Sequence, residues 1–497
     1  MKKTTKKTVA KRGQIQDPHS NLMFADVILR SITGRSAMAV VSTITPQNVA
    51  EYLPSKDTLD EARRLLTALG FQINMKARTH ITIGGTTDLF ENTFRVRLTQ
   101  KFAPYLKPPK GGRTVRATQS YFVPDVPAKI PDNLSTVVEA LEFPGPITYL
   151  ASAAPPPLNY GYMKVPGDVA HYMAAPAAHL LGYTGSGIKL AMVDTGFMTP
   201  LHPYYAGKGY NIQLVPDGLD PTPDADDVGH GTAISACALA VAPGVTYAVY
   251  KIYSPALGSP KIADAFSRAV EDGANIITCS WGTLYSTALA IAINDAVAAG
   301  IVVCFACGNG GSVDWPGSEP CVISVGGAFI DDRSLQASDF ASSGTNTMNP
   351  GRQVPDLCGI TGMAPEGVLI AMPTQPSSYL DNYFAGSDGT TPVDAWIVAS
   401  GTSSATPMVA ATAALMMEVD RSLVGDPDNI KKALIKSCTD VSTGTSASGE
   451  HARPGIDLAT GAGLVQAYPG VNSLVMSLKE KVTNDVDQIA AEARQPA

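Results

Sequence analysis

Short apolar runs alternate with helical segments between residues 188 and 306. The apolar runs occupy residues 188–193, 245–250, 275–278 and 301–306. The helical segments occupy residues 262–272 and 288–299, and each ends at a glycine, Gly273 or Gly300. Continuous apolar runs are typical of strands buried on both faces, and their alternation with helices predicts βαβ units. We therefore expect an α/β domain whose mostly parallel sheet carries helices on both faces.

Length and charge limit the remaining possibilities. The 497 residues predict about two or three domains, and the apolar (45%) and charged (16%) fractions are those of globular proteins. The net charge of −7 predicts no nucleic-acid partner, because such proteins carry a basic surface. The exception is the basic start, MKKTTKKTVAKR. A disordered, solvated tail over residues 1–20 is the prediction there, and contact with an anionic surface is the alternative.

Signals for location point to the cytoplasm. No apolar stretch follows the basic start, so no secretory signal is expected, and no run reaches the ~18–20 residues of a membrane span. The seven cysteines are odd in number and lack framework spacing. Cys279, Cys304 and Cys307 fall in apolar runs, which predicts buried free thiols.

The chain divides into five stretches by composition. After the tail come a first domain at 21–145, a linker rich in Pro and Ala at 146–165, the α/β domain at 166–470 and a C-terminal tail at 471–497. Within the last stretch, residues 475–491 are helix-like. A terminal helix is the prediction for them, with a role in assembly as the alternative.

The first domain has a β-α-β-β-α-β rhythm, the ferredoxin-like arrangement of a small α+β fold. The predicted strands are residues 36–43, 71–76, 80–85 and 95–100, and the predicted helices are residues 58–69, which stop at Gly70, and 86–94. Leu59, Ala62, Leu65 and Leu66 share one face of the first helix.

Three short segments hold the chemistry-bearing residues: AMVDTG with Asp194, DDVGHGT with His230, and SGTSSATPM with Ser403. Each residue alone also has an ordinary structural interpretation. Asp194 could be a helix cap or turn residue, His230 a loop residue or metal ligand, and Ser403 a helix N-cap. Together they supply what a serine nucleophile needs, since the hydroxyl requires a base and the imidazole requires a carboxylate. All three follow predicted strands or begin helices at one end of the sheet, in the order Asp, His, Ser.

These segments resemble the three signature motifs of the subtilisin-like serine peptidases. The resemblance extends through ADAFSRAVEDGANIITCSWG and CFACGNGG and covers nearly all of residues 175–470. It implies that Ser403 is the nucleophile, His230 the general base and Asp194 its orienting carboxylate. It also implies that the side-chain amide of Asn309 and the backbone N–H of Ser403 bind the developing oxyanion. A plain turn residue is the alternative for Asn309.

The resemblance also implies a substrate-binding edge. Ser280, Trp281 and Gly282 match the strand that pairs with extended polypeptide substrate, and Gly308 is expected to line the specificity pocket. A core or rim aromatic is the alternative for Trp281. Ala233 and Met408 stand where relatives commonly have His, at positions without a catalytic role.

No cofactor is required by this chemistry, and no metal ligands are assigned. An acidic run leaves two alternatives open, a calcium site and a solvated loop. Its members are Asp217, Asp220, Asp224, Asp226 and Asp227.

The first domain resembles the propeptides of the subtilisin-like and sedolisin-like peptidases, especially the sedolisin (pro-kumamolisin) type, through TPQNVAEYLPSKDTLDEARRLLTALGFQI and IGGTTDLFENTFRVRL. Such propeptides assist folding and cover the active site, and residues 151–160 would cross the site or be cut. Sedolisins use Ser with Glu and Asp, whereas GHGT retains a histidine, so subtilisin-like chemistry is expected.

The sequence thus predicts a cytoplasmic serine endopeptidase that forms an acyl-enzyme and is held inactive by its own prodomain. Three alternatives remain: a catalytically silent peptide-binding scaffold, a sedolisin-related peptidase, and a peptidase dedicated to one partner protein.

Overall fold

The computed structural model describes residues 22–39, 44–73, 77–104, 118–149, 162–216, 220, 222, 224–254, 258–330, 334–363 and 369–492. The predicted basic tail and most of the predicted linker, residues 150–161, lie outside these ranges. None of the helices within the ranges combines the length and apolar character that a membrane crossing needs.

The α/β domain is built on an eight-stranded sheet. Its strands are β9 (Lys189–Asp194), β10 (Asn211–Leu214), β11 (Thr246–Lys251), β12 (Ile276–Cys279), β14 (Val302–Ala306), β15 (Ile323–Ile330), β16 (Leu335–Ala337) and β19 (Leu357–Ile360). They lie in the order β10-β11-β9-β12-β14-β15, with β16 and β19 both paired to β15. Only the β15–β16 pair is antiparallel among these, so the predicted mostly parallel sheet is confirmed.

The strand order reverses at β9, which has β11 on one side and β12 on the other. In open α/β sheets, ligands bind beyond the carboxyl ends of the strands at such a reversal. Asp194 is the last residue of β9 and therefore lies at that point.

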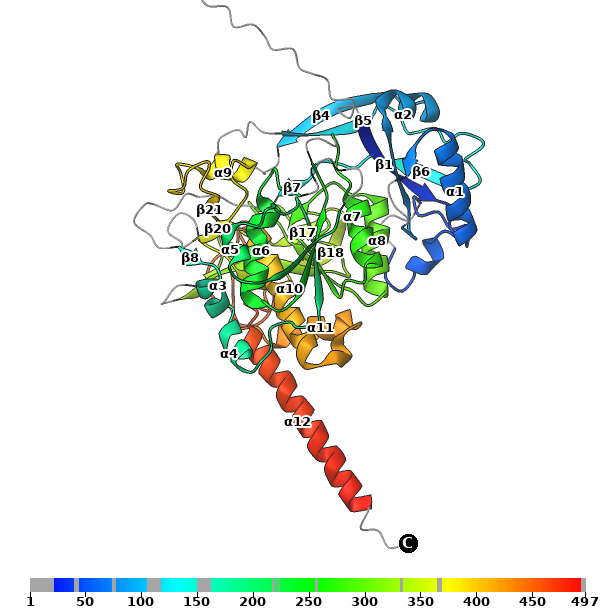
Figure 1. Ribbon diagram of the computed structural model, residues 1–497. Helices are drawn as coiled ribbons and strands as arrows, with labels where there is room; N and C mark the ends of the chain where they lie inside the picture. Colours follow the sequence, from blue (N-terminus) through cyan, green and yellow to red (C-terminus); the bar gives the residue numbers. More distant parts are fainter. Residues whose placement is uncertain are drawn as a thin grey trace, which may run out of the picture.

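Helices cover both faces of the sheet (Figure 1). They are α6 (His230–Val241), α7 (Ile262–Glu271), α8 (Thr287–Ala298) and α10 (Thr402–Val419). α6 packs on α10 and α7 packs on α8, so the four helices form two pairs, one on each face of the sheet. The long helix α10 packs on α6 and on the central strands. Almost every residue of α6 and α10 is buried, which explains why both are apolar on all sides.

Smaller elements complete the domain. They are β8 (Met163–Lys164), α3 (Gly167–Tyr172), α4 (Ala175–Leu180), α5 (Pro203–Ala206), β13 (Trp281–Gly282), β17 (Gly344–Asn346), β18 (Asn349–Val354), β20 (Ile370–Pro373), α9 (Tyr379–Phe384), β21 (Trp396–Ala399), α11 (Pro427–Lys436) and α12 (Ala467–Glu492). The predicted boundary at residue 470 falls inside α12, so the described part of the predicted tail is a helix. Its first turns contact α4 and α10, and the rest projects from the body (Figure 1).

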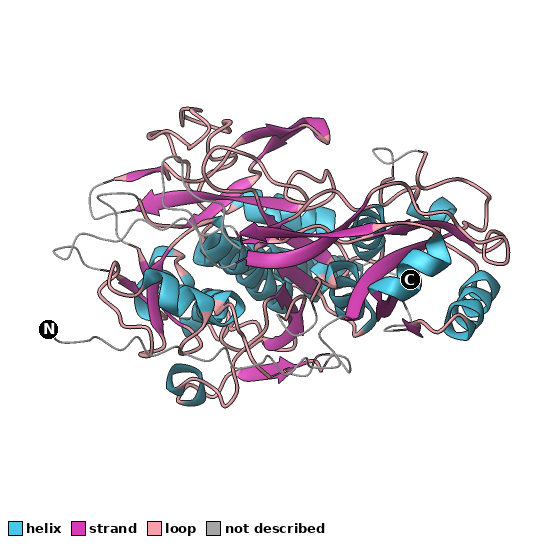
Figure 2. Ribbon diagram, turned by 90° about the horizontal axis from the view of Figure 1, so that it is seen from above, coloured by secondary structure: helices cyan, strands magenta, loops and turns pink. Residues whose placement is uncertain are grey.

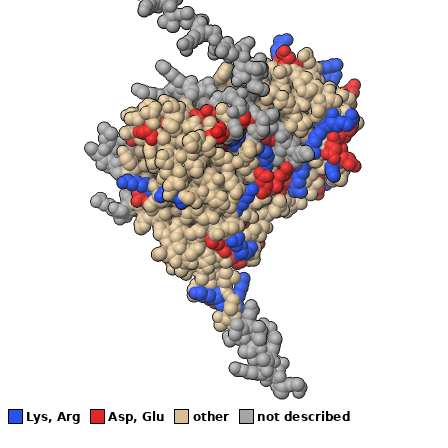
Figure 3. Space-filling model, viewed as in Figure 1, with Lys and Arg blue, Asp and Glu red and all other residues tan. Residues whose placement is uncertain are grey.

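The N-terminal domain has a four-stranded antiparallel sheet in the order β2-β3-β1-β6. Its elements are β1 (Leu22–Leu29), the 3₁₀ turn η1 (Val49–Tyr52), α1 (Lys56–Ala68), β2 (Gln72–Ile73), β3 (Ile81–Thr86), α2 (Thr87–Phe94), β4 (Leu98–Pro104), β5 (Thr118–Pro124) and β6 (Val138–Glu142). The short strand β7 (Thr148–Tyr149) follows in the predicted linker. Leu59, Ala62 and Leu66 of α1 are buried, as predicted, while Leu65 is half-buried. Lys and Arg lie beside Asp and Glu on the exposed side of α1, where Arg63 pairs with Asp60 and Arg64 with Glu61 (Figure 3).

One strand prediction in this domain is wrong, and a second strand has a different partner from the one expected. Residues 36–39 lie outside any strand, residues 40–43 lie outside the described ranges, and the first strand is β1. β1 is buried on both faces, so it is apolar nearly throughout and lacks the alternation of a half-buried strand. The predicted strand at 95–100 overlaps β4, but β4 pairs only with β5, and β6 closes the sheet instead. The β4–β5 ribbon forms an arm that reaches over the α/β domain (Figure 1; Figure 2).

The N-terminal sheet packs against α7 and α8. Met23, Ala25 and Val27 of β1 belong to the core of the N-terminal domain, while Ile28 belongs to the core of the α/β domain. A hydrogen bond also joins β1 to the α/β domain: the N–H of Phe24 donates to Ser259 Oγ at 3.0 Å.

Charged groups also join the two domains. Arg78 Nε donates to Asp295 Oδ2 of α8 at 2.8 Å. Glu142 Oε2 accepts hydrogen bonds from Ala288 N at 3.2 Å and Ser286 Oγ at 3.3 Å, so a carboxyl of the N-terminal domain caps α8. Burial raises the pKa of Glu142.

Candidate active site

Asp194 and His230 form a buried pair. His230 Nδ1 lies 2.8 Å from Asp194 Oδ1, which also accepts the N–H of Thr195 at 2.8 Å. Asp194 is 0% and His230 2% exposed. A carboxylate in this position fixes the imidazole as the tautomer with a proton on Nδ1, which leaves Nε2 able to accept a proton.

The glycines beside His230 are required by close packing. Gly229 has φ +85°, and a Cβ there would lie 2.3 Å from both Ser378 Oγ and Thr374 Oγ1. A Cβ on Gly231 would lie 2.3 Å from the carbonyl oxygen of Gly196. The GHG sequence therefore lets the start of α6 approach the end of β9 closely enough for the Asp194–His230 contact.

Asp226 holds the same helix start in place, a role that the sequence analysis missed. Its Oδ1 accepts the N–H of Gly229 at 2.8 Å, and its Oδ2 accepts the N–H of Thr232 at 2.7 Å. Burial raises the pKa of this carboxyl, and hydrogen bonds from Thr195 and Thr232 partly offset the effect. The carboxylate caps α6 around His230.

Ser403 is the second residue of α10 and is 3% exposed. Its Oγ donates to the carbonyl oxygen of Ser280 at 2.9 Å, and Ser280 Oγ donates back to the carbonyl oxygen of Ser403 at 2.9 Å. Ser403 and His230 line the same small cavity, together with Leu380, Phe384 and other apolar side chains. The structure thus brings the three predicted triad residues to one end of the sheet.

Asn309 lies in the loop after β14 and is oriented by the residue before Ser403. Its Oδ1 accepts hydrogen bonds from the N–H and the hydroxyl of Thr402, both at 3.2 Å. This arrangement fixes which end of the amide carries the NH₂ group. The first N–H groups of a helix have no carbonyl partner within it, and the amide of Ser403 belongs to that first turn of α10. The oxyanion role of Asn309 stays a prediction that this geometry supports.

The predicted substrate edge is β13, which directly follows β12 and Ser280. β13 pairs antiparallel with β7, which lies at the start of the predicted linker, with Trp281 facing Tyr149 and Gly282 facing Thr148. The indole of Trp281 is fully buried and donates to the carbonyl oxygen of Val193 at 2.6 Å. It also packs edge-on against the buried ring of Phe305. The core alternative is therefore correct for the ring of Trp281, and only its backbone lies at the edge.

Gly308 is a glycine for a different reason from the one predicted. It has φ +124°, and a Cβ there would lie 2.5 Å from the carbonyl oxygen of Ser312 in its own loop. The same Cβ would lie 3.0 Å from Asp314 Oδ2. The loop itself excludes a side chain at Gly308, and the predicted crowding of substrate is not needed to explain it.

The acidic run makes protein contacts. Asp220 Oδ2 and Asp227 Oδ2 lie 3.1 Å and 3.9 Å from Lys251 Nζ, and Asp226 caps α6. Within the described ranges no three His, Cys, Asp or Glu side chains are placed to hold a metal ion together, and Asp217 lies outside those ranges. An internal lysine thus occupies the place between two of the candidate calcium ligands.

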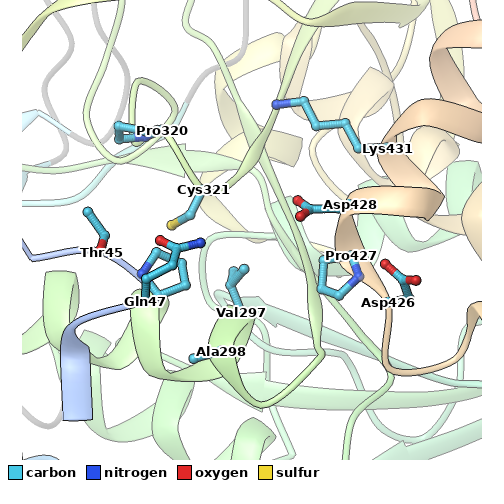
Figure 4. Close-up of a pocket in the computed structure, with 11 residues that line it drawn as sticks. Thr45, Gln47, Val297, Ala298, Pro320, Cys321, Asp426, Pro427, Asp428 and Lys431 are labelled. Carbon is cyan, nitrogen blue, oxygen red and sulfur yellow. The ribbon is translucent and has the colours of Figure 1, made fainter.

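A second cavity lies where the N-terminal domain meets α8 and α11 (Figure 4). Its lining includes Gln47, Cys321 and Asp428, and none of its lining residues belongs to the triad or to β13. Lys431, at its edge, pairs with Asp356 at 2.9 Å. We assign this cavity no ligand.

The comparisons agree with this geometry. The subtilase family model matches residues 185–463. Subtilisin E of Bacillus subtilis (strain 168) is 33% identical over 220 residues, which cover 40% of this chain and 56% of that protein. Subtilisin of Bacillus pumilus is 33% identical over 220 residues (40% and 78%), and the alkaline protease of Shouchella clausii is 31% identical over 251 residues (48% and 63%).

The chain spans about half the length of the first of these relatives. The family model covers more than half of the chain and includes Asp194, His230 and Ser403. The chain belongs to the subtilase family.

Proposed function

We propose that the protein is a serine endopeptidase that hydrolyses polypeptides through an acyl-enzyme. The observation that carries the proposal is the Asp194–His230 pair beside the same cavity as Ser403. The subtilase match and the subtilisin relatives support it.

Each group has one task in the proposed reaction. Ser403 Oγ attacks the scissile carbonyl carbon while its proton passes to His230 Nε2. The Nδ1–H of the imidazolium stays bound to Asp194, and the NH₂ group of Asn309 and the N–H of Ser403 stabilise the oxyanion. The C–N bond then breaks, His230 protonates the leaving amine, and water hydrolyses the ester by the same steps.

The test of the proposed function is digestion of an unfolded protein, such as casein, by chain cut within residues 150–161, followed by mass analysis of the fragments. The account predicts internal cleavage that a fluorophosphonate abolishes. Fragments trimmed only from the ends, or cleavage insensitive to the fluorophosphonate, would contradict the endopeptidase assignment.

Asn309→Ala is expected to lower kcat about 10²–10³-fold, the size of the effect in subtilisin, while KM changes little. The reason is that the amide contacts the oxyanion, which is absent from the bound substrate and develops only as Ser403 attacks, in the transition state and the tetrahedral intermediate. Steady-state kinetics on a short peptide measure this. Because Asn309 also accepts from Thr402, Asn309→Asp serves as the comparison: it keeps an acceptor for Thr402 and removes the donor. Full activity in Asn309→Asp would show that no donor is needed.

We further propose that the N-terminal domain is a prodomain that keeps the enzyme inactive. β7 lies along β13, the edge at which an extended substrate would pair. The sheet of the N-terminal domain covers α7 and α8, and Glu142 caps α8. The helix and strand order supports a propeptide-like role, and the sedolisin-type resemblance remains a proposal.

Thr148→Pro is expected to speed fluorophosphonate labelling of the intact chain about two- to tenfold, because proline removes one N–H and weakens the β7–β13 pairing. Thr148→Ala keeps the backbone N–H and is the matched control. Labelling is followed over time on chains whose mass shows that residues 1–497 remain intact. Equal rates for the proline variant, the alanine variant and the wild type would mean that β7 does not restrict access.

Location and substrate range are also proposals. All seven cysteines lie in described residues and are free thiols, five of them buried. Cysteines that remain free thiols support a location in a reducing compartment such as the cytoplasm. In that setting, limited cleavage of one partner protein is a second candidate for the physiological role.

A further inference from the structure

Asp314 is an ionisable group between the two segments that would border a bound substrate. A Cβ on Gly282 of β13 would lie 2.7 Å from Asp314 Cβ and 3.2 Å from its Cγ. On the other side, Asp314 Oδ2 lies directly over the α-carbon of Gly308, which precedes Asn309. The side chain of Asp314 therefore packs across both glycines.

The backbone around Asp314 is held firmly. Its N–H donates to the carbonyl oxygen of Cys307 at 3.0 Å, and its neighbours Val313 and Trp315 are buried. Trp315 Nε1 is bound to Glu319 Oε1 at 2.6 Å. Asp314 itself is only partly buried, so its carboxyl lies at the boundary between the core and the binding edge.

The position of a substrate follows from β7. An extended chain that pairs with β13 as β7 does would run past Gly282 and Trp281 toward Ser280. The carbonyl oxygen of Ser280 accepts from Ser403 Oγ, so the residue that reaches Ser280 carries the carbonyl that Ser403 attacks. Side chains of an extended strand alternate between its two faces. On the inner face, the side chain of that residue would enter the space between β13 and the Gly308 loop.

We infer that Asp314 gives the enzyme a preference for a cationic side chain, lysine or arginine, on the residue whose carbonyl is attacked. A carboxylate at this boundary attracts an ammonium or guanidinium group and disfavours an acidic one. Burial beside two glycine α-carbons limits its hydration, which strengthens the attraction. The inference rests on the proposed peptidase function and names its substrate class.

The test compares matched peptides that differ only at this residue: lysine, its neutral isostere norleucine, and glutamate. We expect kcat/KM for lysine to exceed that for norleucine about 10–100-fold, the worth of a hydrogen bond to a charged group. In Asp314→Asn the ratio should fall to near one, and Asp314→Glu, which keeps the charge, should restore most of it. Asp394→Asn, an exposed carboxylate elsewhere, is the control for a general change in charge.

The possible outcomes separate the two proposals. If the wild type is labelled by a fluorophosphonate and cleaves peptides but treats lysine and norleucine alike, the inference about Asp314 fails and the peptidase function stands. If wild-type chain cut within residues 150–161, which releases the proposed prodomain, is neither labelled nor active, both fail. If Asp314→Asn does not fold, the wild type alone still tests the inference about Asp314. An electrostatic preference for lysine over norleucine must become smaller when the salt concentration rises from about 0.05 M to 1 M. A lysine preference that stays constant as the salt concentration rises would contradict the inference about Asp314.

Discussion

Ser403→Ala is expected to lower kcat for peptide hydrolysis about 10⁶-fold, the size of the effect in subtilisin, and to abolish fluorophosphonate labelling. The loss is this large because no other group can form the acyl bond. The rest of the site should persist, since the replacement removes only one hydroxyl, which donates to the carbonyl oxygen of Ser280. Hydrolysis of a peptide and labelling of the same preparation measure the two effects.

Ser422→Ala is the matched control for this replacement, because Ser422 is an exposed serine near the end of α10. It should behave as the wild type does. If Ser403→Ala keeps labelling or turnover, another residue is the nucleophile and the account of the site is wrong.

Asp194→Asn is expected to lower kcat about 10⁴-fold with little change in KM. An asparagine in this place can present its NH₂ group to His230 Nδ1, which favours the tautomer with the proton on Nε2. That tautomer cannot accept the proton of Ser403. The effect should be smaller than that of Ser403→Ala, because the nucleophile and the oxyanion donors remain.

Asp194 is fully buried, so the fold of this variant must be checked by thermal unfolding. Asp60→Asn, on the exposed side of α1, controls for the loss of one negative charge. Near-normal turnover in a folded Asp194→Asn protein would show that His230 does not depend on Asp194.

Much of the α/β domain could be predicted from the sequence, because its strands are buried on both faces and two of its helices, α7 and α8, are each followed by a glycine. Gly273 and Gly300 have φ +75° and +88°, conformations that glycine adopts without strain. The positions of the three proposed triad residues could be predicted for a related reason: Asp194, His230 and Ser403 each lie where a strand ends or a helix begins. Local sequence is informative at such points.

Long-range pairing could not be predicted in the same way. The strand at 95–100 was expected in the main sheet, yet β4 pairs with β5, and residues 138–142 take the edge beside β1. Nothing in the local pattern of β4 distinguishes these partners. The continuous apolar pattern of β1 was missed because its second face is buried only by α7 and α8 of the other domain.

The site residues that were missed act through tertiary contacts. Asp226 belongs to an acidic run that suggested calcium, but its carboxyl caps α6 beside His230. Asp314 is an isolated aspartate in sequence, and only the folded chain places it against Gly282 and Gly308. In both cases the relevant neighbours are backbone atoms, which no spacing rule identifies.

The most direct test of the central claim is to locate the site of fluorophosphonate attachment by peptide mapping, on Thr148→Pro protein or on chain cut within residues 150–161. The account predicts a single adduct on Ser403 that is absent from His230→Ala. No adduct, or an adduct on any other residue, would contradict it.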